Sequence, residues 1–131
     1  MDHKEKTRAL RACEEIHYNC CQSVLLTFTE ELGLTEQQLY ALGTNFSGGM
    51  RHGSACGALA GAMMVLGLMG YGDEAAQPLL RQFKQAHEVT DCASLLRAAH
   101  HRGESRKSHC DNLVYEMVEA VEQVLQQSKE E

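Results

Sequence analysis

The chain has 131 residues, which is enough for one domain with a hydrophobic core and too few for two domains of ordinary size. Its formal net charge is -6, from 18 acidic against 12 Lys and Arg residues, which argues against nucleic acid or an anionic membrane as a partner. The N-terminal stretch MDHKEKTRALRACEE is charged throughout and lacks the apolar segment of a secretory signal, so we expect a cytoplasmic location.

Two helices are predicted in the first third of the chain. Apolar residues recur at three- and four-residue steps from about residue 4 to residue 31, which predicts one long amphipathic helix closed by Gly33. Thr35 and Gln38 have capping-box spacing, and they predict a short helix that ends at Gly43.

A glycine-rich loop precedes the most apolar stretch of the sequence. Gly48, Gly49 and Gly53 allow a tightly shaped loop, and Ser54 is the expected cap of a helix that extends to about Met69. This helix is shorter than the roughly 20 residues that cross a bilayer. We therefore expect a buried core helix and no insertion into a membrane.

The remaining elements are also helical. Helices are predicted over residues 74–85 and 91–99, followed by a polar linker over residues 100–107. The last helix has an apolar stripe through Leu113, Met117, Val121 and Leu125, and we expect its end, residues 126–131, to be frayed. Because no segment alternates like a strand, we predict an all-α, single-domain bundle over residues 1–131, with about four long helices and one or two short ones.

Three of the six cysteines share a local pattern. Cys56, Cys92 and Cys110 each follow a Ser or Thr by two residues, so each is predicted in the first turn of a capped helix. Backbone N–H groups and the helix dipole there favour the thiolate over the thiol. Two alternatives stay open: free cysteines are commonly buried as small apolar side chains, and the helix that holds Cys110 could begin near Glu104.

The other candidate residues lie in helices and loops around these cysteines. Cys20 is predicted inside the first helix, on the same face as Cys13 and His17. His52 precedes Cys56 by four residues, so it is a candidate ligand or proton partner, or else an exposed loop residue without a role. The linker residues, which include Arg106, are interpreted as a solvated connection. Alternatively, they form a flexible lid whose cations offset thiolate charge. His109 lies just after this linker.

The spacing of the cysteines excludes two common sites. No C-x-x-C pair is present, and the ligand pairs of a zinc finger are absent. If the cysteines act together, the fold must therefore bring them together from distant parts of the chain.

The blocks NCCQSVL, FSGGMRHGSACGALAGAMMVLGLMGYG, FKQAHEVTDCASLL and HCDNLVYEMVEAVEQVL resemble the C_GCAxxG_C_C family, which is described as redox-active. The resemblance extends from about Tyr18 to Leu125, and CGALAG matches the central CGAxxG motif letter for letter. It implies that the four family cysteines correspond to Cys20, Cys56, Cys92 and Cys110. Cys13 lies outside the family pattern, and Cys21 stands where relatives tend to have a small residue.

Three functional hypotheses follow from these residues. The first is an iron–sulfur cluster or another thiolate-bound metal such as zinc, held by Cys20, Cys56, Cys92 and Cys110 beside Gly48, Gly49, Gly53 and His52. The second is a metal-free thiol–disulfide protein in which Cys56 attacks and Cys92 or Cys110 resolves. The third is a helical interaction module with inert buried cysteines.

The sequence leaves the partner and the enzyme class open. Both redox hypotheses require an electron donor or acceptor, and a glycine-notched apolar helix is compatible with a homodimer as well as with packing inside one chain. No hydrolase motif is present, so a conventional hydrolase is not expected.

Overall fold

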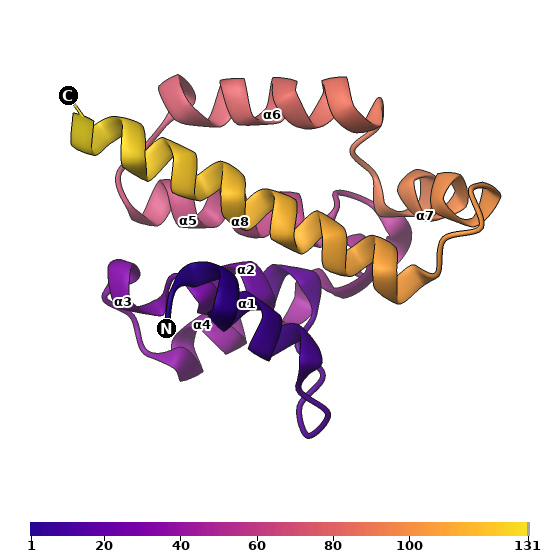
Figure 1. Cartoon of the computed structure of the whole chain (residues 1–131), viewed down its shortest axis with the longest axis horizontal. Coiled ribbons are helices and arrows are strands. Elements are labelled where there is room, and N and C mark those ends of the chain that lie inside the picture. Colours follow the sequence, from indigo (N-terminus) through magenta and orange to yellow (C-terminus); the bar gives the residue numbers. More distant parts are fainter. Residues whose placement is uncertain (131) are drawn as a thin grey trace.

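The computed structural model describes residues 1–130. Within them the chain forms eight α-helices and no β-strand, which confirms the predicted all-α fold (Figure 1). The helices are α1 (His3–Ala12), α2 (Cys20–Thr27), α3 (Thr29–Leu32), α4 (Glu36–Gly43), α5 (Gly57–Leu68), α6 (Asp73–His87), α7 (Cys92–His101) and α8 (Arg106–Glu130), with two short helical turns, η1 (Thr44–Phe46) and η2 (Gly49–Gly53).

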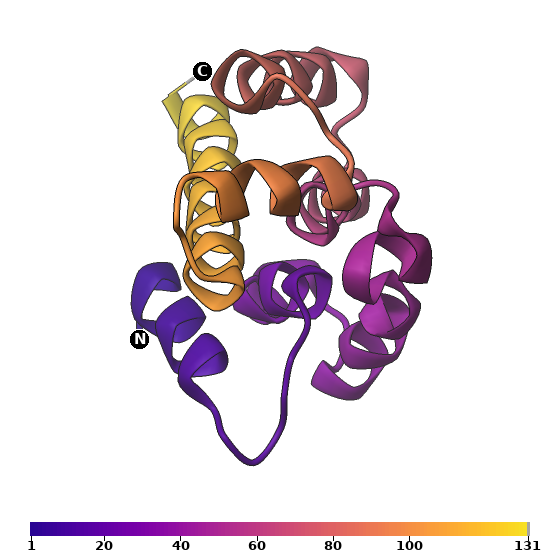
Figure 2. The same ribbon diagram turned by 90° about the vertical axis from the view of Figure 1, so that its right-hand side faces the viewer.

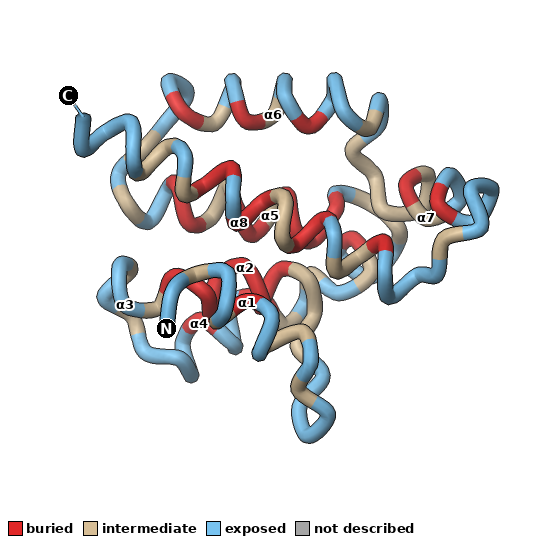
Figure 3. Tube along the Cα trace, in the orientation of Figure 1, coloured by how far each residue is buried: buried red, intermediate tan, exposed pale blue. Residues whose placement is uncertain are grey.

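The core lies between α2, α5 and α8, which pack against one another (Figure 3). Every α2 residue from Cys21 to Thr27 is buried. Gly61 lets α5 approach α2 closely, since a Cβ atom there would lie 3.0 Å from Cβ of Val24 and 3.0 Å from the carbonyl oxygen of Cys21. The predicted stripe of the last helix faces this core, where Leu113, Met117 and Val121 are buried.

The other helices cover this core from different sides. Helix α1 packs on α2 and α8, and α4 packs on α2. Helix α6 runs along the opposite side, next to α5 and apart from α1 (Figure 1). Figure 2 shows α7 crossing the molecule near the start of α8, where it also contacts η2. The start of α8, α7 and η2 thus meet at one end of the molecule.

The single long helix predicted over residues 4–31 is wrong. Helix α1 ends at Ala12, its C-cap Cys13 has an extended backbone, and a loop follows. Helix α2 begins afresh because Asn19 and Gln22 form a capping box: Oδ1 of Asn19 accepts from the N–H of Gln22, and Oε1 of Gln22 accepts from the N–H of Asn19. Cys13, His17 and Cys20 therefore do not share one helix face.

The capping box predicted at Thr35 is confirmed. Its hydroxyl accepts from the N–H of Gln38, at 3.0 Å, and α4 ends at Gly43 as expected. None of the helices in residues 1–130 combines the length and the apolar character that crossing a membrane would need. The cytoplasmic location stays a prediction, and so does the homodimer alternative.

Candidate functional site

Four cysteines from four helix starts line one small cavity of about 90 Å³. Cys20 is the first residue of α2, Cys56 is the N-cap of α5, Cys92 is the first residue of α7, and Cys110 is the fifth residue of α8. All four thiols are free, and all except Cys56 are partly exposed. The structure thus brings together the four positions that the family resemblance selects.

A backbone bridge places Cys56 next to Cys92. Ala55 and Asp91 form an isolated antiparallel β-bridge. On its two sides the N–H of Cys56 donates to the carbonyl of Thr90, at 2.9 Å, and the N–H of Cys92 donates to the carbonyl of Ser54, at 2.6 Å. Two segments far apart in the sequence are therefore joined through the backbone at the cysteines.

The glycine-rich loop forms one side of the cavity in a left-handed conformation. Gly48, Gly49, Met50 and Arg51 all have positive φ, between 55° and 65°. Non-glycine residues adopt this region only at a cost in free energy. Gly49 has a second reason to be glycine, because a Cβ atom there would lie 2.6 Å from Cβ of Cys92.

The candidate loop residues divide into two groups. Gly48 and Gly49 line the cavity. Gly53 and His52 do not belong to its lining: Gly53 faces Ala93, where a Cβ atom would approach Cβ of Ala93 to 3.0 Å, and His52 is exposed.

The capping pattern proposed for the three cysteines is wrong in detail. Ser54 does not cap α5, which begins without a side-chain cap, and α7 is capped by Asp91, whose carboxylate accepts from the N–H of Ser94 at 2.9 Å. Helix α8 begins at Arg106, and the hydroxyl of Ser105 accepts from the N–H of Ser108. Cys110 thus lies in the second turn of its helix, close to the alternative considered from the sequence.

Burial outweighs the helix dipole at two of the thiols. Burial raises the pKa of Cys56 to about 11, although the backbone N–H groups of Leu59 and Ala58 favour its thiolate. Burial likewise raises the pKa of Cys92. Both thiols are therefore protonated at neutral pH, in contrast to the prediction of activated thiolates at these helix starts.

Cys20 and Cys110 form an unequal pair. A hydrogen bond from the Cys20 thiol lowers the pKa of Cys110 below its ordinary value of 9.0, and the guanidinium groups of Arg106 and Arg11 lower it further against the effect of burial. The same hydrogen bond, followed by burial, strongly raises the pKa of Cys20. The proton of the pair is therefore held on Cys20, and Cys110 is the thiol that ionises more readily.

Two arginines act on Cys110, and the sequence indicated only one of them. Arg11 lies on α1, where its Nε donates to Oδ1 of Asp111 at 2.8 Å and a terminal nitrogen donates to the carbonyl of Tyr18 at 3.0 Å. Nothing local in the sequence indicates this placement. Arg106 belongs to the linker whose cations were one candidate to offset thiolate charge, and its position four residues before Cys110 is the helical spacing that brings the two side chains to one face.

The two additional cysteines lie outside the cavity lining. Cys21 is fully buried in α2, with its sulfur 3.8 Å from Sδ of Met64. Cys13 ends α1 and is half-buried. Neither shares the cavity with the other four cysteines.

The geometry does not match a site for a single metal ion. Within residues 1–130 no three His, Cys, Asp or Glu side chains converge closely enough to hold one ion. The arrangement is instead a small cavity with four thiols around it. Such a set can exchange electrons through sulfur, or surround a group larger than one ion.

Comparison with known proteins identifies the family. Residues 18–124 match the family model described as "Putative redox-active protein (C_GCAxxG_C_C)". The chain belongs to this family. No curated protein and no solved structure shows significant similarity to it. For this member of the family, the structure shows that the four motif cysteines share one cavity.

Proposed function

We propose that this C_GCAxxG_C_C protein is a thiol–disulfide redox protein in which Cys20 and Cys110 alternate between a dithiol and a disulfide. The observation that carries the proposal is that Cys20 and Cys110 line one small cavity together with two further cysteines. The two residues are far apart in the sequence, and the packing of α2 against α8 brings them to the same cavity. Both residues are partly exposed.

The chemistry balances without a metal. The Cys110 thiolate attacks one sulfur of a partner disulfide, so that a new S–S bond forms and the partner's S–S bond breaks with release of one thiolate. Cys20 then loses its proton and attacks the sulfur of Cys110. The second partner sulfur leaves and takes up that proton. The protein has lost two electrons, and the partner disulfide has become a thiolate and a thiol.

Cys110 is a better attacking group than Cys56, which the sequence suggested. Attack requires a thiolate at ambient pH and access to the partner sulfur. Cys56 is only 4% exposed and its thiol is protonated, whereas Cys110 is half-buried with a lowered pKa. Cys56 and Cys92 complete the cavity as a second, protonated pair of thiols.

A four-thiolate iron–sulfur cluster is the second candidate. It is favoured by one observation, that cysteines from four separate segments surround a common cavity. A zinc ion needs its ligands around one point, which these residues do not provide, whereas a cluster spreads its thiolates over several irons. Cys20, Cys56, Cys92 and Cys110 would hold such a cluster, and it would supply one-electron transfer.

Metal analysis and thiol counting on the same sample test the proposal. The protein is purified without oxygen and without a metal-affinity column, and its metal content, sulfide content and absorption spectrum are recorded. It is then equilibrated with an excess of a disulfide. We expect metal-free protein that loses two free thiols per chain, and a Cys110→Ser variant that does not.

Two other results would contradict the proposal. Iron and sulfide with visible absorption bands, lost in a Cys56→Ser variant, would establish the cluster. A metal-free protein whose thiols resist oxidation over the whole range of disulfide buffers would support the inert interaction module.

A further inference from the structure

We infer that the cysteine pocket selects disulfides that carry an anionic group near the reacting sulfur, and that Arg106 binds this group at the rim. The inference rests on the proposed thiol–disulfide function and adds the class of substrate. It is carried by the charges in the cavity wall, by the lack of an internal partner for Arg106 and by the size of the cavity.

The cavity wall differs in charge from the chain as a whole. The chain has a net charge of -6, yet within residues 1–130 the lining of this cavity includes no carboxylate. It does include the guanidinium of Arg106, beside the imidazoles of His17 and His109; burial lowers the pKa of His109, which keeps that imidazole neutral near neutral pH. A guanidinium without a carboxylate beside it attracts an anion locally even though the protein as a whole repels anions.

Arg106 differs from the neighbouring cations in having no acidic partner inside the described part of the chain. Arg11 and Lys107 both pair with Asp111, at 2.8 Å and 3.0 Å, and Arg102 pairs with Glu104, at 3.1 Å. The side chain of Arg106 makes no ion pair and no hydrogen bond within residues 1–130, and it is exposed at the start of α8. Its planar set of N–H donors is therefore free to bind a carboxylate or a similar anion.

His109 supplies a second polar group without a partner. It is only 4% exposed, and its Nε2 has no hydrogen-bond partner in the described structure. Its Nδ1 lies 4.0 Å from the nearest carboxylate oxygen of Glu104, which is beyond hydrogen-bond distance. Buried polar nitrogens are normally hydrogen-bonded, so an unpaired one in a cavity wall is a group that a ligand could satisfy.

The size of the cavity decides which part of the substrate enters. A volume of about 90 Å³ corresponds to roughly three water molecules. It accommodates the reacting sulfur and its immediate neighbours, while the rest of the substrate stays outside. The charged group of a short alkyl disulfide then lies near the rim, where Arg106 is placed.

A series of short alkyl disulfides of different charge tests the inference. The probes are dithiodiglycolate, which is anionic, bis(hydroxyethyl) disulfide, which is neutral, and cystamine, which is cationic. Rates of oxidation of the protein are measured by stopped flow and divided by the rates of a small model thiol with the same probes. For the unmodified protein we expect the normalised rates to fall in the order anionic, neutral, cationic.

The deciding variant is Arg106→Gln, with Arg102→Gln as the matched control because Arg102 is paired with Glu104 and lies outside the cavity lining. Removing the Arg106 charge lowers the thiolate population equally for all probes, so only the ratio of rates reports binding of the anion. We expect Arg106→Gln to reduce the anionic-to-neutral ratio about fivefold, as removing a nearby charge at a partly exposed site should. The control should leave this ratio unchanged.

The outcomes separate this inference from the proposed function. If the protein reacts with all three probes and Arg106→Gln does not change their ratios, the inference is overturned and the thiol–disulfide function stands. If the unmodified protein reacts with none of the probes, the proposed function fails and this inference fails with it.

Discussion

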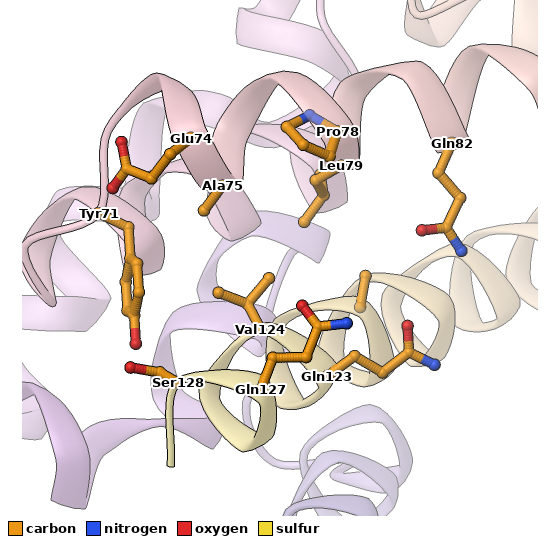
Figure 4. A pocket seen from close by; sticks show the side chains of 11 residues that line it. Tyr71, Glu74, Ala75, Pro78, Leu79, Gln82, Gln123, Val124, Gln127 and Ser128 are labelled. Atoms are coloured by element: carbon orange, nitrogen blue, oxygen red, sulfur yellow. The ribbon is translucent and has the colours of Figure 1, made fainter. Parts of the chain in front are cut away.

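Two hollows on the same molecule differ in the way they are built. The larger, about 470 Å³, lies between α6 and α8, where the amide side chains of Gln82, Gln123 and Gln127 line it together with Leu79 and Val124 (Figure 4). Its lining, within residues 1–130, includes neither a cysteine nor a basic residue. The smaller hollow, about 90 Å³, is lined by four cysteines and an arginine. The smaller one therefore contains the reactive groups.

The two hollows also differ in their structural constraints. The cysteine pocket is held by a backbone bridge and by glycines that leave no room for a side chain. The larger hollow separates α6 from α8, and α6 makes its main helix contacts with α5. The tightest packing and the reactive thiols therefore lie at the same place, the cysteine pocket. Substitutions in the cysteine pocket and in the larger hollow should have different consequences.

The largest expected effect is at Gly49. A Cβ atom there would clash with Cys92 and would force a non-glycine residue to a φ of 65°. We expect Gly49→Ala to lower the free energy of unfolding by about 3 kcal/mol, as measured by chemical denaturation. Gly67 on α5 is the matched control, because it has open space around it, and Gly67→Ala should stabilise the protein by about 0.5 to 1 kcal/mol. Equal effects of the two substitutions would show that the packing around Gly49 leaves room for a side chain.

A substitution in the larger hollow should lower the stability of the fold without changing the reactivity of the thiols. Leu79 on α6 is 4% exposed, and we expect Leu79→Ala to lower the free energy of unfolding by about 2 kcal/mol. The rate at which Cys110 is alkylated in the folded protein should stay the same, as followed by mass spectrometry of the modified peptide. A changed rate would show that the two regions are coupled.

The reactivity of Cys110 should depend on Cys20. The Cys20 hydrogen bond is the main cause of the lowered pKa of Cys110, whereas burial acts in the opposite direction. In Cys20→Ala the inflection of the alkylation rate against pH should therefore move upward, and the rate near neutral pH should fall about tenfold for each pKa unit gained. Cys56→Ala is the control, and it should leave the inflection in place. If the alkylation rate of Cys110 depends on pH in the same way in Cys20→Ala as in the unmodified protein, Cys20 does not lower the pKa of Cys110.

The smallest expected effect concerns Asp91, which caps α7. Hydrogen bonds from Ser94 hold the pKa of this carboxyl below its ordinary value of 3.8. A lowered pKa in the folded state contributes stability that is present above pH 3.8 and is lost as the pH falls below it. Unfolding followed against pH should show a shallower acid decline for Asp91→Asn, which keeps a capping oxygen but does not titrate. An unchanged acid decline would mean that the cap makes no pH-dependent contribution.

Much of the fold could be predicted from local signals. The capping box at Thr35 and the apolar stripe of α8 depend on residues close together in the sequence, and both are present in the structure. The break before α2 was missed although Asn19 and Gln22 have the same capping-box spacing. The apolar periodicity across residues 13–20 indicated a continuous helix, whereas the capping box at Asn19 begins a new one.

The candidate site could be predicted in its membership but not in its chemistry. The family resemblance selected the four cysteines, and the structure brings them to one cavity. The pKa of each thiol depends on burial and on contacts across the chain, such as that between Cys20 and Cys110. The position of a cysteine in its own helix, which favoured Cys56 as the attacking group, includes none of these contacts.

The central claim, that Cys20 and Cys110 form the redox pair, is tested most directly by mapping disulfides in the intact protein. The chain is equilibrated with buffers of increasing disulfide-to-thiol ratio, its remaining thiols are blocked, and its peptides are mapped by mass spectrometry. We predict that a bridge between Cys20 and Cys110 forms first, while Cys56 and Cys92 stay reduced. A first bridge that includes Cys56, or the absence of any bridge across the whole range of buffers, would contradict the claim.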